Sequence, residues 1–171
     1  MSRRLRRLCR SSALCAAITV ILVTSSACKS AAGPKSAPDD RITQLNVITV
    51  PVALDLDGKA GPDGIALKLY AASARSAKAI RLREGKVELV MFNGTFQNRT
   101  NQPAILRTFS YEAKELRLHE LNSGIGWGYE FTLPWGTNLP TQRLISVGAR
   151  YTAPDGRSIV SRTSSVTVLN K

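Results

Sequence analysis

The chain has 171 residues, 43% of them hydrophobic, with 24 basic and 12 acidic side chains and a formal net charge of +12. Its three cysteines are Cys9, Cys15 and Cys28, so the sequence that follows them has no thiol for a disulfide, a cysteine nucleophile or a cysteine-ligated metal. The basic residues are scattered along the chain instead of forming one run, which disfavours nucleic acid as a partner.

The first 27 residues are predicted to be an export signal. Five arginines, from Arg3 to Arg10, precede an apolar run over residues 13–23, and small residues follow it without any acidic residue. This order is typical of signal peptides. The apolar run is about half the roughly 20 residues that a membrane-spanning helix needs, so an uncleaved anchor is the weaker alternative. Removing the signal leaves 19 basic and 12 acidic side chains, a net charge near +7.

Residues 25–28, SSAC, resemble the lipobox of bacterial lipoproteins, in which a signal peptidase cuts before a cysteine whose sulfur receives a diacylglycerol. The resemblance implies that Cys28 begins the mature chain, carries the diacylglycerol and an acyl chain such as palmitate, and anchors the protein to a membrane. Lys29 after the cysteine implies the outer membrane. An ordinary secretory signal is the alternative, and it would leave the lone thiol of Cys28 on a soluble protein.

A flexible tether is expected between this cysteine and the folded domain. Residues 29–40, KSAAGPKSAPDD, are rich in Ala, Ser, Pro and Gly and lack apolar periodicity. A dozen such residues have an r.m.s. reach of roughly 20 Å. We therefore expect the lipidated cysteine and its tether at 28–44 and one domain at 45–171, a length that can bury a single core.

The remaining sequence alternates between apolar segments and turns. Segments expected to be strands lie at 45–54, 64–73, 86–94, 104–111, 126–136, 143–153, 158–162 and 164–170. Several have a period of two, as where Ile65, Leu67 and Leu69 share one face. Seven or eight short strands indicate an all-β fold, an antiparallel β-sandwich of immunoglobulin-like or transthyretin-like type.

One short helix or turn is expected to interrupt the strands. It would lie within 111–121, with Ser110 as its N-cap and Glu112 near the positive end of the helix dipole. Further along, Asp155 and Gly156 are typical turn residues and predict a hairpin between the strands that flank them.

The combination of export signal, tether and small sandwich, with DLDGKAGPDGIALKLYA at residues 55–71, resembles bacterial lipoproteins of the cell envelope. The resemblance concerns location and fold, and it implies no activity.

Groups for acid–base or nucleophilic catalysis are sparse, and we predict no catalytic residue and no cofactor. His119, the single histidine, lies in the expected helix, and no nucleophile elbow or glycine-rich phosphate loop occurs. A carboxylate-dependent hydrolase is the enzymatic alternative, and it would need acids brought together in space. The acids considered for it are Glu88, Glu112, Glu115, Glu120 and Glu130.

Asp55, Asp57 and Asp63 lie in one loop and are weak candidates for a calcium site. Carboxylate oxygens are the ligands that calcium prefers, but the loop lacks the distal glutamate of an EF-hand. Aspartate and glycine also suit a turn between strands for reasons of backbone geometry alone.

The segment GIGWGYEFTLPW contains an aromatic ridge, because its large side chains share one parity. The ridge comprises Trp127, Tyr129, Phe131, Leu133 and Trp135. It is expected to form the core if it faces inward. If part of it faces outward, Trp127, Tyr129 and Trp135 would offer a binding surface on which a sugar ring could stack. The glycines of the opposite parity leave a strip on which another backbone or a ligand could lie.

We therefore expect a non-enzymatic lipoprotein of the cell envelope. Its partners would be a membrane, through the lipid on Cys28, and another envelope protein or a cell-wall polymer. A carbohydrate-binding module that recognises cell-wall glycan through an exposed tryptophan is the alternative.

Overall fold

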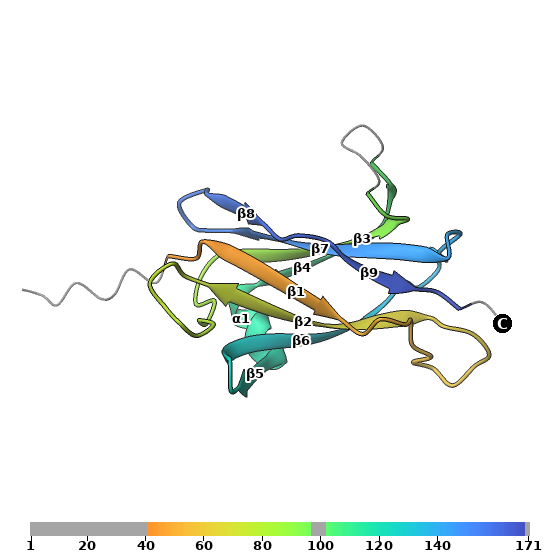
Figure 1. The fold of residues 1–171 in the computed structure, drawn as a ribbon, viewed down its shortest axis with the longest axis horizontal. Helices are drawn as coiled ribbons and strands as arrows, with labels where there is room; N and C mark the ends of the chain where they lie inside the picture. Colours follow the sequence, from red (N-terminus) through yellow and green to blue (C-terminus); the bar gives the residue numbers. More distant parts are fainter. Residues whose placement is uncertain (1–40, 97–101, 170–171) are drawn as a thin grey trace, which may run out of the picture. The chain divides into compact units, whose positions relative to one another are not determined.

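The computed structural model describes residues 41–96 and 102–169, so the expected export signal, Cys28 and the tether up to residue 40 lie outside the described residues. Within them, nine strands form two antiparallel sheets that pack face to face (Figure 1). The all-β sandwich predicted from the alternating segments is confirmed. None of the helices among the described residues is long and apolar enough to cross a membrane.

The strand order is that of an immunoglobulin-like sandwich. One sheet has the order β1 (Gln44–Thr49), β2 (Gly64–Ala72), β6 (Gly126–Pro134), β5 (Glu120–Ser123). The other has the order β4 (Ala104–Glu112), β3 (Lys86–Asn93), β7 (Leu144–Thr152), with β8 (Ser158–Val160) and β9 (Ser164–Thr167) both pairing with β7. In chain order these arrangements correspond to the A-B-E-D and C′-C-F-G sheets of that fold, with β8 and β9 as two halves of an interrupted last strand. After β1 the chain crosses to the second sheet, where Val52 pairs in parallel with Thr167.

The core lies between the two sheets and follows the alternation of the strands. In β2, Ile65, Leu67 and Leu69 are buried while Lys68 is exposed. In β3, Val87 and Leu89 face them from the other sheet and are also buried.

The short helix predicted within 111–121 is confirmed, although it covers only part of that range. It comprises α1 (Ala113–Leu116) and a 3₁₀ turn, Arg117–His119, and its N-cap is Glu112 instead of Ser110. The Glu112 N–H donates to the Glu115 carboxylate at 2.7 Å, which satisfies one of the backbone donors at the start of the helix. Ser110 remains in β4, and Glu120 begins β5, whose first two residues fall within the range predicted for the helix.

The folded domain begins slightly earlier than predicted. Ile42 is buried in the core, and the Thr43 N–H donates to the Ala72 carbonyl at 2.9 Å. The expected tether, 28–44, therefore ends before Ile42, because an apolar side chain and a backbone hydrogen bond hold this part of the chain to β2.

Candidate functional site

The aromatic ridge of β6 is part of the core. Tyr129, Phe131, Leu133 and Trp135 are each at most 1% exposed. A sugar at the protein surface cannot reach the rings of Tyr129 and Trp135. The alternative prediction, that these two side chains belong to an exposed binding surface, is therefore wrong. The inward orientation follows from the parity that the four side chains share.

Trp127 is the half-buried member of the ridge. The Arg81 guanidinium lies 3.7 Å from the centroid of its ring, and Arg81 Nη2 lies 2.9 Å from Glu120 Oε2. One face of the indole is therefore covered by a cation that a carboxylate holds in place. A sugar could stack on that face only by displacing Arg81.

The space beside the glycines that oppose the ridge is occupied by other parts of the protein. A methyl group at Gly128 would come within 2.5 Å of the Tyr70 ring, and one at Gly126 within 2.4 Å of the Ala79 carbonyl oxygen. Gly126 also has φ +112°, a conformation that L side chains rarely adopt. The strip therefore receives the Tyr70 ring at Gly128 and the backbone of Ala79 at Gly126. A neighbouring backbone thus lies on part of it, as one alternative expected, and backbone hydrogen bonds hold Ala79 against β6.

Residues 81–85 continue from that contact and are attached to both sheets. The Leu82 N–H donates to the Tyr129 hydroxyl at 2.6 Å, and the Tyr151 hydroxyl donates to the Glu84 carbonyl at 3.1 Å. Burial raises the pKa of Tyr129 to about 12 and also raises the pKa of Tyr151, so both hydroxyls stay protonated at neutral pH. Leu82 is 2% exposed, and the two arginines that flank it are directed to the surface.

These arginines line a cavity of about 400 Å³, which we call the arginine pocket. Arg41, Arg81, Arg83 and Arg157 surround it together with the carboxylates of Glu84 and Asp155. Arg157 Nη1 donates to the Ile42 carbonyl at 3.1 Å, which ties the hairpin between β7 and β8 to the start of β1. A second depression, of about 340 Å³, adjoins it and adds Arg117.

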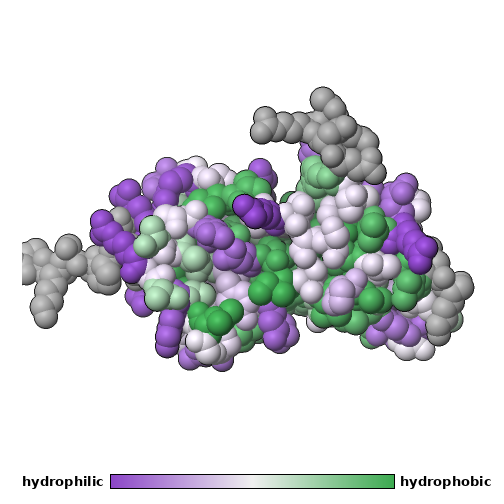
Figure 2. Space-filling view, viewed as in Figure 1, coloured by the Kyte–Doolittle hydropathy of each residue, from purple (hydrophilic) through white to green (hydrophobic). Residues whose placement is uncertain are grey.

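The arginine pocket belongs to a strongly basic end of the sandwich. We define the basic end as the end at which β1 and β3 begin and β2, β4 and β7 end, on the left in Figure 1. Among the described residues, nine basic and five acidic side chains lie there, a surplus of four positive charges, and Figure 2 shows hydrophilic side chains gathered around it. The basic residues are Arg41, Arg75, Lys78, Arg81, Arg83, Lys86, Lys114, Arg117 and Arg157, and the acidic ones are Glu84, Glu112, Glu115, Glu120 and Asp155.

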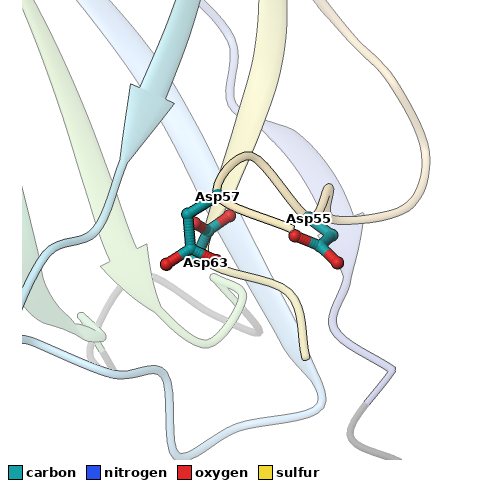
Figure 3. A group of neighbouring side chains, drawn as sticks. All are labelled: Asp55, Asp57 and Asp63. Atoms are coloured by element: carbon teal, nitrogen blue, oxygen red, sulfur yellow. The ribbon is translucent and has the colours of Figure 1, made fainter. Parts of the chain in front are cut away.

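The opposite end carries the three candidate calcium ligands. The structure brings Asp55, Asp57 and Asp63 together, with one carboxylate oxygen of each within 4.8 Å of the others (Figure 3). We call residues 55–63 the aspartate loop. Among the described residues of the loops at this end, the charged side chains are these three acids and two bases, Lys59 and Arg143.

Each of these aspartates also stabilises the loop itself. Asp63 Oδ1 accepts from the Leu56 N–H at 2.6 Å, and Asp55 Oδ1 accepts from the Gly58 N–H at 2.8 Å. The Lys59 N–H donates to Asp57 at 2.9 Å, and this hydrogen bond, together with the Lys59 ammonium, lowers the pKa of the Asp57 carboxyl. Turn geometry therefore accounts for all three residues, which was the alternative to calcium binding.

The residues considered for catalysis are engaged in structural contacts. The His119 ring packs against Phe131 with centroids 4.5 Å apart, and its Nδ1 lies 3.1 Å from the Glu130 carbonyl oxygen. Glu88, Glu120 and Glu130 form ion pairs with Arg150, Arg81 and Lys68 respectively. The Arg150 pair lowers the pKa of the Glu88 carboxyl. These three acids therefore face cations, whereas a hydrolase needs two acids that face a common substrate.

Comparison with known proteins adds little to this description. No protein-family model matches the chain, and no curated protein matches it significantly. Similar solved structures include a polysaccharide deacetylase from Bacillus cereus, with 10% identity and a TM-score of 0.37, and a cell-surface chitinase from Paenibacillus, with 10% identity and a TM-score of 0.34. The matches cover 73% and 81% of this chain but only 30% and 10% of those proteins, and at such scores they carry no functional inference.

Proposed function

We propose that this protein is a lipid-anchored, non-enzymatic binding module of the bacterial cell envelope. Cys28 would carry the lipid, and the residues that follow it would connect the lipid to the sandwich. The sandwich would present its loops to another envelope protein or to a cell-wall polymer. The lipobox-like sequence and Lys29 favour the outer membrane as the site of anchoring.

The observation that carries this proposal is the position of Cys28 relative to the folded domain. Cys28 follows the apolar run of the signal, and the first buried residue among those described is Ile42. A lipid at Cys28 would thus be separated from the core by a short, polar connection without a further predicted element. Such an arrangement suits a module that is held at a membrane and contacts its neighbours.

Intact-mass spectrometry of the protein extracted from membranes tests the proposal. The expected product begins at Cys28 and carries the mass of a diacylglycerol and one acyl chain. The matched control is Cys28→Ala, which should lose this added mass and its retention in membranes washed with high salt. An unmodified, cleaved product in the soluble fraction of the wild type would overturn the lipoprotein assignment.

A further inference from the structure

The basic end has a form that suits binding of phosphate groups. Arginine presents a planar fork of N–H donors that matches the oxygens of a phosphate, and four arginines surround one cavity here. Glu84 and Asp155 also line this cavity, and Glu120 pairs with Arg81 beside it. Asp155 lies 3.8 Å from the Arg157 guanidinium and accepts from the Arg157 backbone N–H at 3.0 Å. A phosphate would therefore compete with carboxylates for Arg81 and Arg157, and the surplus of positive charge over the whole basic end is what favours it.

The guanidinium groups of Arg81 and Arg157 are held in place by the protein before any ligand arrives. Arg81 is fixed between Trp127 and Glu120, and Arg157 by its hydrogen bond to Ile42. A positioned cation loses less conformational entropy on binding than a free side chain does. Arg41 and Arg83 are exposed at the rim and extend the positive surface outward.

We propose that the basic end binds the headgroups of anionic phospholipid, with a headgroup phosphate in the arginine pocket. This inference rests on the proposed function, because the lipid on Cys28 determines which surface is close by. The domain would then lie on the membrane with its basic end down and its aspartate loop directed away.

The position at which the chain enters the domain favours a membrane over other anionic partners. Residues 29–40 precede Arg41, which is itself part of the arginine pocket. If these twelve residues form the tether that their composition predicts, its r.m.s. reach of roughly 20 Å would keep the basic end near the bilayer. The aspartate loop lies farther away by about the length of β2, roughly 30 Å at 3.3 Å per residue. Its contact with the bilayer, with the domain upright, would stretch the twelve residues to about three quarters of their maximum length of about 40 Å.

Vesicle sedimentation with unlipidated protein tests the inference separately from the anchor. The protein is the full mature chain with Cys28→Ala, and the vesicles are pure phosphatidylcholine or phosphatidylcholine with about one third phosphatidylglycerol. We expect binding to the anionic vesicles, release in high salt, and little binding to the neutral ones. Wild-type lipidation is measured by mass spectrometry, so failure of vesicle binding would overturn this inference while leaving the lipoprotein proposal intact.

Matched double substitutions locate the binding surface. Arg41→Glu with Arg83→Glu reverses two charges at the arginine pocket, and we expect a loss of at least about tenfold in partition onto anionic vesicles. Arg143→Glu with Arg162→Glu makes the same change in net charge at exposed positions outside the basic end. We expect this control to retain binding within about threefold.

Two results would contradict the proposal. Equal losses in both double variants would show a response to net charge alone. Equal binding to soluble polyphosphate at the same phosphate concentration, with the same dependence on Arg41 and Arg83, would assign the site to anionic polymers instead of lipid. Circular dichroism checks the fold of each variant, and the single substitution Arg83→Glu provides the same comparison if the double variant is unstable.

Discussion

The two ends of the sandwich hold their charged side chains in different ways. At the basic end, Arg81 is positioned by side chains from β5 and β6, and Arg157 by the backbone at Ile42. In the aspartate loop, Asp55 and Asp63 accept hydrogen bonds from backbone N–H groups at most seven residues away. The geometry of the basic end therefore depends on tertiary packing, whereas that of the aspartate loop is local. A substitution in the core should therefore disturb the geometry of the basic end more than that of the aspartate loop.

The two tryptophans provide the largest expected difference between the ends. Trp135 is 1% exposed, and its backbone N–H donates to the Asp63 carbonyl at 3.0 Å. Trp135→Ala should lower the free energy of unfolding by about 3–5 kcal/mol, because it leaves a large cavity. Trp127→Ala should cost only about 1–2 kcal/mol, since the ring is half-buried and loses mainly its contact with Arg81.

Urea denaturation followed by circular dichroism measures both variants against the wild type. Each variant retains one tryptophan, so acrylamide quenching of its fluorescence is the control. Trp135 should be shielded from acrylamide and Trp127 partly accessible. Equal losses of stability, or an accessible Trp135, would contradict the assignment of the ridge to the core.

Tyr129 tests how far the basic end depends on the core. Tyr129→Phe removes the hydroxyl that accepts from the buried Leu82 N–H, and we expect a loss of about 1–3 kcal/mol at neutral pH. In the folded wild type, burial raises the pKa of Tyr129 from its ordinary value of 10.0 to about 12. Because burial favours the neutral phenol, this contribution to stability is complete below pH 10 and is lost as the pH rises toward 12.

Denaturation midpoints at pH 7, 10 and 11.5 measure this effect. The wild type should lose more stability than Tyr129→Phe between pH 10 and 11.5. The same variant should bind anionic vesicles less tightly at neutral pH, because Arg81 and Arg83 flank Leu82. Parallel pH curves for the two proteins would show that Tyr129 is not protected by the fold.

Local patterns in the sequence predicted much of the fold. The period of two in β2 and in β6 predicted which side chains are buried, because alternate residues of a strand face opposite sides of the sheet. Asp155 and Gly156 form the predicted turn, with Gly156 at φ +81° and Thr152 paired with Ser158. The aspartate cluster was also found, since its members lie within one loop.

The arginine pocket was missed because its members come together only through tertiary packing. Ile42 and Arg157 lie 115 residues apart, and no spacing rule connects them. The short sequence Arg81-Leu82-Arg83 held a partial signal, because a buried leucine between two arginines places both at the surface.

The strand β5 was missed for a similar reason. Glu120 and Leu121 continue the helical pattern, and their pairing with β6 determines the strand.

The smallest expected effect separates the two explanations of the aspartate loop. If the carboxylates serve turn geometry, Asp63→Ala should cost about 1 kcal/mol through the lost hydrogen bond to Leu56, whether calcium or a chelator is present. The thermal midpoint of the wild type should then be the same in millimolar calcium as in EDTA. If the loop binds calcium, the metal should raise the midpoint of the wild type, and Asp63→Ala should abolish that rise. Asp155→Ala, which removes a similar hydrogen bond at the basic end, is the control and should respond to neither condition.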